Sequence, residues 1–425
     1  MDTTKIAVIG LGYVGLPLAV QLAKNFIVTG FDINKSRIDE LKEYTDSTLE
    51  VDSKDLQNDN FIPTHQESNL NEQNIYIVTV PTPITKRKTP DLSPIMQASQ
   101  VIGRNLSKNA IVVYESTVYP GVTEDICGPI LEQASGMSCG SDFFLAYSPE
   151  RINPGDKEHT VDKITKVISG QNEEVINRIK NVYGSINNDN IFVAKDIKTA
   201  EAAKVIENAQ RDINIAFINE ITTIMGKLGI SIHNVLDAAK TKWNFLNFQP
   251  GLVGGHCIGV DPYYLLHKSK QMGIDPQVIL SGRRINDGMP AFIAKRLIQM
   301  LIQKGKSPQN AKVLVKGMTF KENVADIRNS KVVELINELM EYSVNVHIVD
   351  PHASPNEVAH EYKLTLLENV STDYDAVIVA VSHEEYKHLS EDDFTSLMGN
   401  DSILMDLKSM YKPLTNSKSF SYWSL

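Results

Sequence analysis

A glycine-rich turn near the start of the chain constrains its fold more than any other feature. The turn is Gly10-Leu11-Gly12-Tyr13-Val14-Gly15, and it follows an apolar run at residues 5–9. An apolar run of this kind predicts a buried parallel strand. Residues 16–24 have helical spacing, and residues 26–31 form a second apolar run that leads into Asp32. The sequence therefore predicts a strand–turn–helix–strand unit of the kind that binds dinucleotides.

Each glycine of this turn has a separate part in the prediction. We expect Gly10 to permit the tight turn, Gly12 to let the backbone approach a pyrophosphate, and Gly15 to let helix and strand pack closely. Asp32 can accept hydrogen bonds from both ribose hydroxyls, and its charge repels a 2′-phosphate, so NAD is favoured over NADP. Arg37 is either a nearby cation that softens this preference or an ordinary solvated helix charge.

Strand and helix signals alternate along the rest of the chain and predict its architecture. Further apolar runs lie at residues 75–80, 110–114 and 143–146, and strand signals return at residues 312–315, 344–349, 376–381 and 403–405. Between these two groups the pattern is helical, with long runs over residues 200–228 and 290–304. We therefore expect an α/β fold in which two Rossmann-like doubly wound domains are joined by a central helical domain with a long helix. The expected domains are residues 1–198, 199–305 and 306–425.

Composition limits the compartment and the partners. The 425 residues carry a net charge of -10 without a long basic run, which disfavours nonspecific binding to nucleic acid. The three cysteines, Cys127, Cys139 and Cys257, do not form the pattern of a disulfide framework, and a reducing compartment fits them. The sequence shows no signal peptide and no apolar run long enough to span a bilayer. We expect a cytoplasmic protein with neither nucleic acid nor membrane as a partner.

A second group of candidate functional residues surrounds Cys257. The segment Gly254-Gly255-His256-Cys257-Ile258-Gly259-Val260-Asp261 places a thiol among glycines, which let a ligand approach the backbone closely. Hydride transfer alone needs no thiol, whereas a thiol can hold an aldehyde covalently so that a second hydride leaves from the adduct. We therefore expect Cys257 to be the nucleophile in a two-step oxidation of an alcohol to an acid. The alternative is a small buried cysteine.

The neighbours of Cys257 are less decisive. Asp261 is expected to handle a proton or orient a water, although a turn residue before Pro262 would give the same sequence. His256 is not expected to activate Cys257, because adjacent residues of an extended segment point in opposite directions. No Cys or His pair has the close spacing that zinc needs, so we expect no metal.

Two further sets of polar residues are candidates for binding a substrate. Lys204 and Asn208 lie one helical turn apart and Arg211 extends the same face, so together they can hold an oxyanion, a water and a carboxylate product. The alternative is a solvated helix face. Lys321 and Arg328 follow a predicted strand, where loops of such sheets bind ligands, and two cations there suit a diphosphate.

Seven motifs in the same order resemble the UDP-glucose/GDP-mannose dehydrogenase family along essentially the whole chain. They are Gly10-x-Gly12-x-x-Gly15, Val80-Pro81-Thr82-Pro83, Glu115-Ser116-Thr117-Val118, Ser148-Pro149-Glu150-Arg151, Glu201-x-x-Lys204-x-x-x-Asn208, Gly254-Gly255-His256-Cys257 and Phe320-Lys321-x-x-x-x-Asp326-x-Arg328. The resemblance implies oxidation of C6 of a nucleotide sugar from alcohol to carboxylate with two NAD. It also implies that the first domain binds NAD, that the central domain carries the catalytic cysteine and forms a homodimer or higher homo-oligomer, and that the last domain binds the UDP-sugar.

The resemblance further implies roles for single residues. Cys257 would form a thiohemiacetal and then a thioester, Lys204 would stabilise the oxyanion or act as acid/base, and Asn208 and Asp261 would hold the water. Thr117 would touch both water and nicotinamide, and Glu150 is counted among the catalytic residues. The implied cofactor contacts are Gly10, Leu11, Gly12, Gly15, Asp32, Arg37, Thr82, Thr117 and Arg328. The implied substrate contacts are Arg151, Lys204, Asn208, Arg211, Gly254 and Lys321, of which Lys321 would hold the diphosphate.

One position departs from the UDP-glucose enzymes of the family. They carry a second glutamate after the Ser-Pro-Glu motif, used as a general base, where this chain has Pro154. The segment Glu150-Arg151-Ile152-Asn153-Pro154-Gly155 is instead similar to the UDP-N-acetylhexosamine branch, in which Arg151 would meet the acetamido group or the C6 product. We expect UDP-N-acetylglucosamine as the substrate, for surface-polysaccharide synthesis. The alternatives are UDP-N-acetylgalactosamine or UDP-N-acetylmannosamine, and then UDP-glucose.

Two other classes of protein share part of the pattern. A two-electron hydroxyacid dehydrogenase has a Rossmann domain followed by helices but no use for Cys257. A non-catalytic NAD-binding sensor would tolerate changes at Cys257, Lys204 and Asn208. The number of NADH released per substrate separates the first of these from the four-electron enzyme.

Overall fold

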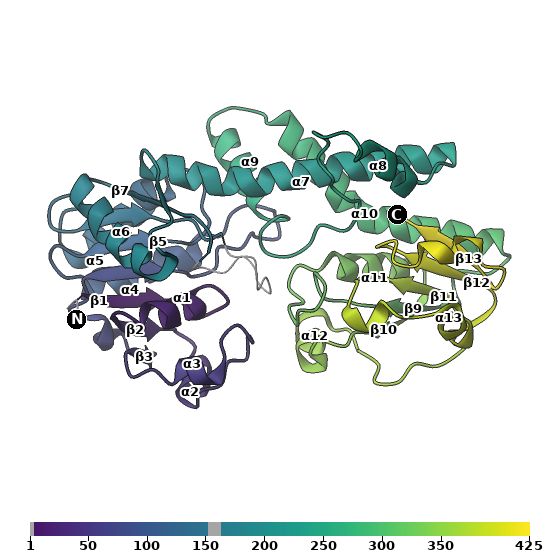
Figure 1. The fold of residues 1–425 in the computed structure, drawn as a ribbon, viewed down its shortest axis with the longest axis horizontal. Helices are drawn as coiled ribbons and strands as arrows, with labels where there is room; N and C mark the ends of the chain where they lie inside the picture. Colours follow the sequence, from purple (N-terminus) through teal and green to yellow (C-terminus); the bar gives the residue numbers. More distant parts are fainter. Residues whose placement is uncertain (1–3, 152–162) are drawn as a thin grey trace. The chain divides into compact units, whose positions relative to one another are not determined.

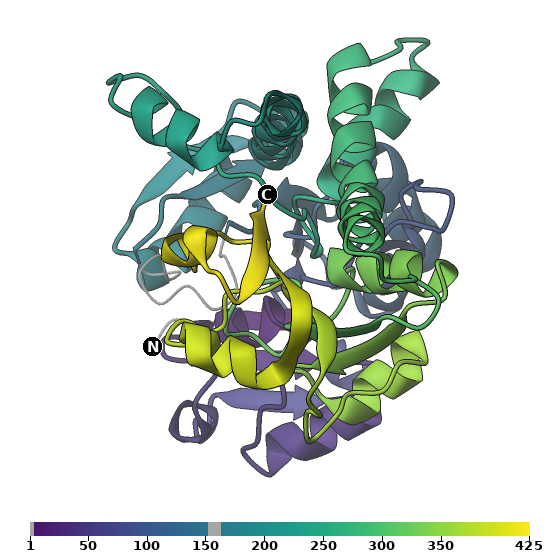
Figure 2. The same ribbon diagram turned by 90° about the vertical axis from the view of Figure 1, so that its right-hand side faces the viewer.

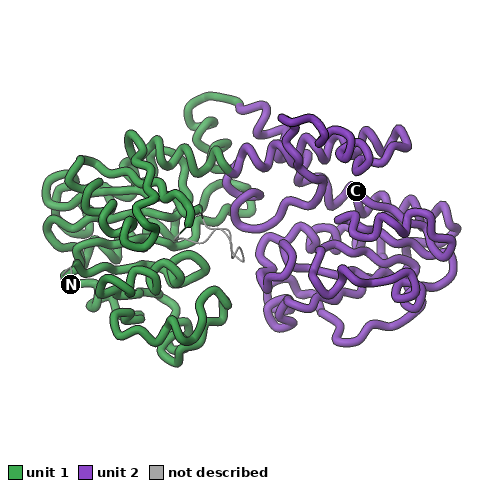
Figure 3. Tube along the Cα trace, in the orientation of Figure 1, with its two compact units in different colours: residues 1–207, 263–275 green, residues 208–262, 276–425 purple. Residues whose placement is uncertain are grey.

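The computed structural model of the protein describes residues 4–151 and 163–425 (Figure 1). Its chain forms two compact units, which Figure 3 colours separately. Unit 1 contains Met1–Glu207 and Tyr263–Asp275, and unit 2 contains Asn208–Pro262 and Pro276–Leu425. The helical middle of the chain is thus shared between the two units, while the three domain boundaries drawn along the sequence stay a prediction.

The sheet of unit 1 has eight strands in the order β3-β2-β1-β4-β5-β6-β7-β8. They are β1 (Lys5–Ile9), β2 (Ile27–Phe31), β3 (Phe61–Thr64), β4 (Ile75–Val78), β5 (Ile111–Tyr114), β6 (Phe144–Tyr147), β7 (Lys166–Gly170) and β8 (Ile191–Val193). Strand β1 pairs in parallel with β2 on one side and β4 on the other, which creates the switch point where doubly wound sheets bind ligands. The predicted parallel sheet is confirmed except at one edge, where β6 and β7 run antiparallel.

Helices cover both faces of this sheet. The helices of unit 1 include α1 (Gly15–Leu22), α2 (Lys35–Lys42), α3 (Ser53–Leu56), α4 (Ser93–Asn105), α5 (Gly128–Ser135), α6 (Glu173–Asn187) and most of α9 (Asp261–Gln271), with the short helices η1 (Glu67–Leu70) and η2 (Thr123–Cys127). Apolar residues of α1 and α6 share one core with alternate residues of the central strands, among them Val8 and Val113. On the other face α4 packs on β5, where Ser99 Oγ lies 2.6 Å from the Tyr114 hydroxyl. The sheet is therefore buried on both faces, as its continuous apolar strands require.

The predicted long helix is confirmed as α7 (Ile197–Leu228), which has 32 residues. It starts three residues earlier than its apolar pattern, because Asp196 caps it and accepts the Thr199 N–H at 2.7 Å. The helix begins in unit 1 and continues into unit 2 from Asn208. The next helix, α8 (Ile232–Ala239), packs Ile232 and Leu236 against Ile218 of α7.

The second long helix differs from its prediction. It is α10 (Gln277–Gln303), and Pro290 lies inside it rather than at its start. A proline removes only one backbone hydrogen bond, which buried side-chain contacts can offset. Arg283 Nη1 lies 2.6 Å from Asp212 Oδ1 of α7, and Asn286 Nδ2 donates to the same oxygen at 2.7 Å. These contacts hold the first half of α10, which precedes the proline, against α7.

The sheet of unit 2 has five parallel strands in the order β10-β9-β11-β12-β13. They are β9 (Lys312–Lys316), β10 (Asn345–Val349), β11 (Tyr374–Val379), β12 (Met398–Asp406) and β13 (Phe420–Ser424), accompanied by α11 (Lys331–Glu341), α12 (Pro355–Tyr362), α13 (Glu391–Leu397), η3 (Glu384–Tyr386) and η4 (Lys412–Asn416). Val313 and Val315 face a core shared with α10 and α11, whereas Leu314 faces a core shared with Phe394 of α13. Figure 2 shows α11 and α13 on opposite sides of this sheet. The second Rossmann-like sheet is confirmed, and β13 adds an edge strand that the sequence prediction missed.

None of the helices within the described residues combines the length and the apolar character that a bilayer span requires.

Candidate active site

The first part of the site lies at the carboxyl end of β1 in unit 1. Gly10 has a φ of +97°, which favours glycine, and its N–H donates to the Phe31 carbonyl at 2.8 Å. The Leu11 N–H donates to Asp32 Oδ2 at 2.9 Å, and Asp32 Oδ1 accepts the Asn34 N–H at 2.8 Å. Asp32 is half-buried, and each carboxylate oxygen keeps a further lone pair. The carboxylate is thus fixed at the end of β2 and can still accept ribose hydroxyls.

The other two glycines of the turn meet different surroundings. A Cβ on Gly15 would lie 1.8 Å from the Gly10 carbonyl oxygen and 2.3 Å from Thr79 Oγ1, so only glycine fits where α1 begins. Among the described residues, a Cβ on Gly12 would meet nothing within 4 Å, and Gly12 is exposed. This open backbone beside a helix start fits a pyrophosphate, which such helix starts bind. The residues of this turn therefore fit NAD.

Arg37 is not the exposed charge that one alternative expected. It is buried, its Nε donates to the Leu11 carbonyl at 2.9 Å, and its Nη2 lies 2.8 Å from Asp46 Oδ1. Its Nη1 forms a further ion pair with Glu40. Arg37 is therefore not a solvated helix charge, because two carboxylates hold its guanidinium, and its contact with the cofactor stays a prediction.

Thr82 and Thr117 come together at the ends of β4 and β5. Thr82 Oγ1 donates to the Thr117 carbonyl at 2.7 Å, and the Tyr264 hydroxyl of α9 donates to the Thr82 carbonyl at 2.7 Å. Both threonines are half-buried. The structure thus joins two of the predicted cofactor contacts through one hydrogen bond.

Glu150 lies beside a buried charge cluster that the sequence analysis missed. Lys166 Nζ lies 2.7 Å from Glu115 Oε2 and 3.8 Å from Glu150 Oε2, and the Tyr183 hydroxyl donates to Glu115 Oε1 at 2.5 Å. Burial raises the pKa of Glu115, while Lys166 opposes that rise. Burial lowers the pKa of Lys166, but Glu115 and Glu150 outweigh it and raise that pKa overall. The available sequence signal was a lysine at the start of an apolar strand.

Lys204 and Arg151 belong to the same unit. Lys204 is buried on α7. Arg151 Nη2 lies 2.8 Å from Glu207 Oε1, also on α7, and Arg151 Nη1 donates to the Thr165 carbonyl at 3.1 Å. Pro154, which distinguishes this chain from the UDP-glucose enzymes, lies outside the described residues.

The second part of the site lies in unit 2 around Cys257. Cys257 is exposed, so it is not the small buried cysteine of the alternative interpretation. Its carbonyl accepts the Asp261 N–H at 2.8 Å, and Asp261 Oδ2 accepts Asn208 Nδ2 at 2.5 Å. Asp261 is buried at the start of α9 rather than in a turn before Pro262, because a proline fits the first turn of a helix. The structure therefore brings Asn208 and Asp261 together, and Arg211 is exposed further along α7.

His256 does not supply a cation to Cys257. The segment from Gly255 to Val260 is a series of turns, so the expectation of an extended segment was wrong. His256 Nε2 lies 4.0 Å from Asp326 Oδ2. Burial and the nearby Arg328 charge lower the pKa of His256 to about 4, despite the opposing effect of Asp326, so its ring is neutral at pH 7.

The glycines before Cys257 pack against the segment between β9 and α11. A Cβ on Gly254 would lie 2.7 Å from the Asn329 carbonyl oxygen, and one on Gly255 would lie 2.7 Å from the Phe320 ring. The Gly255 N–H also donates to the Asn329 carbonyl at 3.2 Å. The cysteine turn and this segment are therefore in direct backbone contact, which a larger residue at either glycine would break.

The two predicted diphosphate ligands lie on this same segment. Lys321 Nζ lies 5.6 Å from the centre of the Phe320 ring. Arg328 forms two hydrogen bonds of 2.8 Å with Asp326. Lys321 thus follows the carboxyl end of β9 next to the residue that packs on Gly255, and Arg328 is held by a carboxylate.

Domain profiles of one family match the chain in order. They are the NAD binding domain, the central domain and the UDP binding domain of the UDP-glucose/GDP-mannose dehydrogenase family, over residues 4–187, 198–288 and 314–413. These three matches cover most of the chain and follow the order of the seven motifs.

Named relatives match over nearly the full length. The UDP-N-acetyl-D-glucosamine 6-dehydrogenase of Pseudomonas aeruginosa is 50% identical over 410 residues, covering 96% of this chain and 97% of the relative. Protein CapL of Staphylococcus aureus is 50% identical over 421 residues, covering 99% of each. The solved structure of the UDP-D-ManNAc dehydrogenase of Pyrococcus horikoshii is 31% identical, with a TM-score of 0.89 over 99% of each chain. The chain therefore belongs to the UDP-glucose/GDP-mannose dehydrogenase family and is an NAD-dependent dehydrogenase.

Proposed function

We propose that the protein oxidises C6 of UDP-N-acetylglucosamine from alcohol to carboxylate, in two successive oxidations that share the nucleophile Cys257. The observation that carries this proposal is the exposed thiol on a turn that is tied on one side to Asn208 and Asp261 and on the other to the Lys321 segment. A thiol in that position has no use in a single hydride transfer.

The choice of sugar rests on the relatives. The two relatives at 50% identity include one named for UDP-N-acetyl-D-glucosamine, whereas the structure named for UDP-D-ManNAc is 31% identical. UDP-N-acetylgalactosamine and UDP-N-acetylmannosamine are the alternatives, because an epimer at C2 or C4 changes only the shape of the pocket. We place the product in surface-polysaccharide synthesis, in a cytoplasmic enzyme.

The chemistry balances around the Cys257 sulfur. In the first oxidation the 6-hydroxyl gives up its proton and C6 gives up a hydride, which makes an aldehyde. The thiolate then adds to C6 and the oxygen takes a proton, which makes a thiohemiacetal. Loss of that proton and of a second hydride leaves a thioester. Water then attacks C6 and gives up its two protons as the C–S bond breaks, which releases the carboxylate and restores the thiolate. NAD, when bound, accepts one hydride in each oxidation, so two NADH form per sugar.

We assign the remaining residues by their chemistry. Lys204 and Asn208 would stabilise the negative oxygen on C6 through both oxidations, as preorganised donors do. Asp261 would hold the attacking water with Asn208, and Glu150 and Thr117 complete the catalytic set. Substrate contacts would come from Arg151, Arg211, Gly254 and Lys321, and NAD contacts from Gly10, Leu11, Gly12, Gly15, Asp32, Thr82, Thr117 and Arg328. Arg37 would support NAD indirectly, through the Leu11 carbonyl that it binds.

The central helices would also form the homodimer. The apolar side chains of Phe217, Ile224 and Leu228 on α7 are 55%, 46% and 63% exposed, which supports a second copy on this helix. Light scattering of the purified protein gives its mass in solution.

A steady-state assay tests the proposed reaction. UDP-N-acetylglucosamine, UDP-N-acetylgalactosamine, UDP-N-acetylmannosamine and UDP-glucose are each supplied with NAD, and NADH is counted per sugar consumed. We expect the highest kcat/KM for UDP-N-acetylglucosamine and two NADH per sugar. One NADH per sugar would indicate a hydroxyacid-type dehydrogenase, and no turnover with any sugar would indicate an NAD-binding sensor.

The covalent step has its own test in Cys257→Ser. A serine hydroxyl is a poorer nucleophile than a thiolate, and the ester that it forms is more stable than a thioester. The number of NADH per sugar should therefore fall from two to one or less, with NAD binding retained. Cys139→Ser, which changes a half-buried cysteine outside the site, is the matched control and should behave as the parent enzyme. Full four-electron turnover in Cys257→Ser would remove the thiol from the mechanism.

A further inference from the structure

A buried carboxylate organises the edge of the unit 2 sheet. Asp350 follows β10, and its side chain is 0% exposed. Asp350 Oδ2 accepts the N–H groups of Met318 and Thr319 at 2.5 and 3.1 Å, and Oδ1 accepts those of His352 and Ala353 at 2.8 and 2.9 Å. Asp350 therefore joins the chain that leaves β9 to the chain that leaves β10.

His383 completes this arrangement from the end of β11. Its side chain is also 0% exposed, and its Nδ1 accepts the Asn323 N–H at 3.0 Å. Because a backbone N–H only donates, Nδ1 must present its lone pair and the proton must sit on Nε2. Nε2 lies 3.2 Å from Asp350 Oδ2 and 3.2 Å from Thr319 Oγ1. His383 thus bridges Asp350 to the backbone of Asn323.

Lys321 lies between the two points that this bridge holds. Thr319 Oγ1 donates to the Lys321 carbonyl at 2.9 Å, so toward His383 Nε2 it can only accept. Beyond Lys321, Asn323 is held twice, because its N–H donates to His383 and its Oδ1 accepts the Glu384 N–H at 2.9 Å. The backbone before and after Lys321 is therefore fixed by the side chains of Thr319, Asp350 and His383, which follow β9, β10 and β11.

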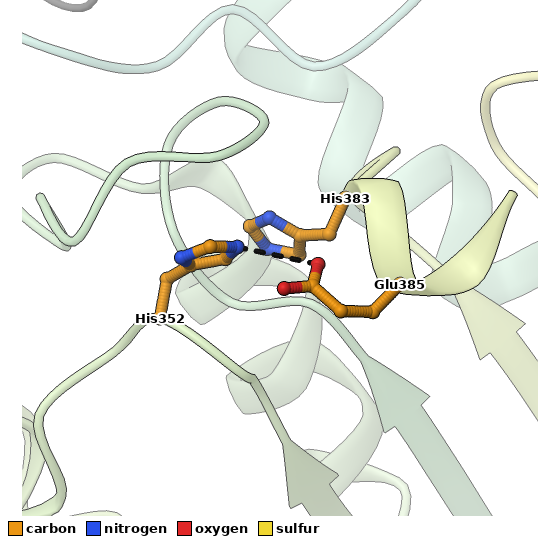
Figure 4. A group of neighbouring side chains, drawn as sticks. All are labelled: His352, His383 and Glu385. Carbon is orange, nitrogen blue, oxygen red and sulfur yellow. Dashed lines mark hydrogen bonds and ion pairs between the residues drawn. The ribbon is translucent and has the colours of Figure 1, made fainter.

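His383 also belongs to a group that could suggest a metal site. His352, His383 and Glu385 each offer a ligand atom within 4.8 Å of the others (Figure 4), and His352 Nε2 lies 3.3 Å from Glu385 Oε2. A metal needs an imidazole lone pair, and the lone pair of His383 Nδ1 faces the Asn323 N–H. The other ring nitrogen carries the proton toward Asp350. The hydrogen bonds therefore favour a structural link over metal binding.

We propose that His383 is a positioning residue that fixes Lys321 for contact with the diphosphate of the UDP-sugar. The proposal rests on the proposed function for the diphosphate role of Lys321, but the link from His383 to Asn323 stands on the structure alone. The same segment reaches Phe320 and Asn329, which contact the glycines before Cys257. If this segment became mobile, binding of the diphosphate would weaken first and the position of the thiol would be disturbed second.

Three variants test the link through activity. His383→Leu leaves the buried Asn323 N–H without its acceptor, and we expect KM for the UDP-sugar to rise about 10-fold with a smaller fall in kcat. His383→Asn places an amide oxygen near the position of Nδ1, so it should recover most of that loss. His352→Ala removes the neighbouring ring without touching Asn323 and should stay within about 2-fold of the parent. Equal KM values for His383→Leu and the parent would overturn the proposal.

A second measurement does not depend on turnover. Hydrogen exchange of the whole protein should show faster exchange in peptides from residues 317–330 of His383→Leu, while peptides of the unit 1 turn and KM for NAD stay unchanged. Unchanged exchange in residues 317–330 would overturn the link. If the parent oxidises no UDP-sugar while exchange still rises, the proposed function fails and the link stands. If His383→Leu does not fold, His383→Gln replaces it, since its amide reaches the Nε2 position and misses the Nδ1 one.

A chelator separates positioning from metal binding. The parent protein is dialysed against EDTA, and its KM for the UDP-sugar and its exchange pattern are measured again. Unchanged values support the hydrogen-bonded link. A loss that zinc restores would overturn it in favour of a metal held by His352, His383 and Glu385.

Discussion

The first strand of each sheet ends in the same backbone arrangement, and the two ends differ in what they hold. Gly10 after β1 has a φ of +97° and Gly317 after β9 has a φ of +91°. The N–H of each donates at 2.8 Å to the last carbonyl of the neighbouring strand, that of Phe31 or of Val349. Both strands thus turn away from their sheets through a left-handed glycine.

The carboxylates that follow are also matched. Asp32 accepts the Leu11 N–H at 2.9 Å, and Asp350 accepts the Met318 N–H at 2.5 Å. As whole residues both are half-buried, but the Asp350 side chain is 0% exposed beside His383, whereas Asp32 binds the turn in which Gly12 is exposed. The first carboxylate is the one that we propose binds a ribose, and the second holds the protein's own segment.

The glycine pair provides the largest expected effect. A Cβ on Gly317 would lie 2.6 Å from Val381 Cβ, while the nearest atom to one on Gly10 is 3.2 Å away. Gly317→Ala should lower the free energy of unfolding of unit 2 by about 3 kcal/mol, because alanine is strained at this positive φ and its Cβ overlaps Val381. Trp243 and Trp423, the 2 tryptophans of the chain, both lie in unit 2, so their fluorescence in urea reports this unit.

Gly10→Ala is the control for that measurement. It belongs to unit 1, so it should leave the tryptophan transition in place and weaken NAD binding instead. Equal shifts of the transition in both variants would break the comparison between the two strand ends.

The carboxylate pair comes next in size. Asp350→Asn replaces an acceptor of several buried N–H groups with an amide that presents its own donors, at a cost of about 2–3 kcal/mol to unit 2. Asp32→Asn should leave the tryptophan transition unchanged and raise KM for NAD about 10-fold. If Asp32→Asn destabilises the protein as much as Asp350→Asn does, the two carboxylates do not differ in role.

Acid should remove the contribution of Asp350 selectively. Burial alone would raise the pKa of Asp350, but hydrogen bonds from His383 and from the Met318 and His352 N–H groups hold it at about 2. Because the folded pKa lies below the ordinary value of 3.8, its contribution of about 2 kcal/mol is present above pH ~4 and is lost as the pH falls toward 2. Urea unfolding at pH 6 and pH 3 should therefore show a smaller gap between the parent and Asp350→Asn at pH 3. A gap that widens in acid would contradict this sign.

The smallest expected effect concerns the preference for NAD over NADP at the carboxyl end of β1. Asp46 and Glu40 hold the Arg37 guanidinium inside the protein. Releasing it with Asp46→Asn and Glu40→Gln together should lower KM for NADP about 3-fold, since Arg37 can then reach a 2′-phosphate while Asp32 still repels it. Glu43→Gln, at the exposed end of the same helix, is the matched control. No change in KM for NADP would assign Arg37 a purely structural role.

The unit 1 end was predictable from sequence because all of its parts are local. The glycines, the helix start and Asp32 follow one another within one strand–helix–strand unit, and the structure places them together. The second Rossmann-like sheet was also predictable from its apolar runs. The start of α10 was not, because contacts of Arg283 and Asn286 with Asp212 outweigh the usual effect of Pro290.

The side-chain clusters could not be predicted in the same way. Lys166 meets Glu115, and His383 meets Asp350, only after strands far apart in sequence pair in the sheet. A lysine at the start of a strand and a histidine after one are ordinary in sequence, and their partners depend on topology. The one available signal for Asp350 was its place after an apolar strand that follows Gly317, which repeats the order of Gly10 and Asp32.

Because Cys257 is exposed, reagents in solution can reach its thiol. Cys127 is buried, and burial raises the pKa of its thiol to about 12; burial also raises the pKa of half-buried Cys139. An alkylating label offered to the folded protein would therefore mark Cys257 before the other two, and a single mass increment would count accessible nucleophiles in a preparation. The same accessibility leaves this sulfur open to peroxide, so storage without a reductant would convert it to sulfenic acid ahead of its sheltered neighbours.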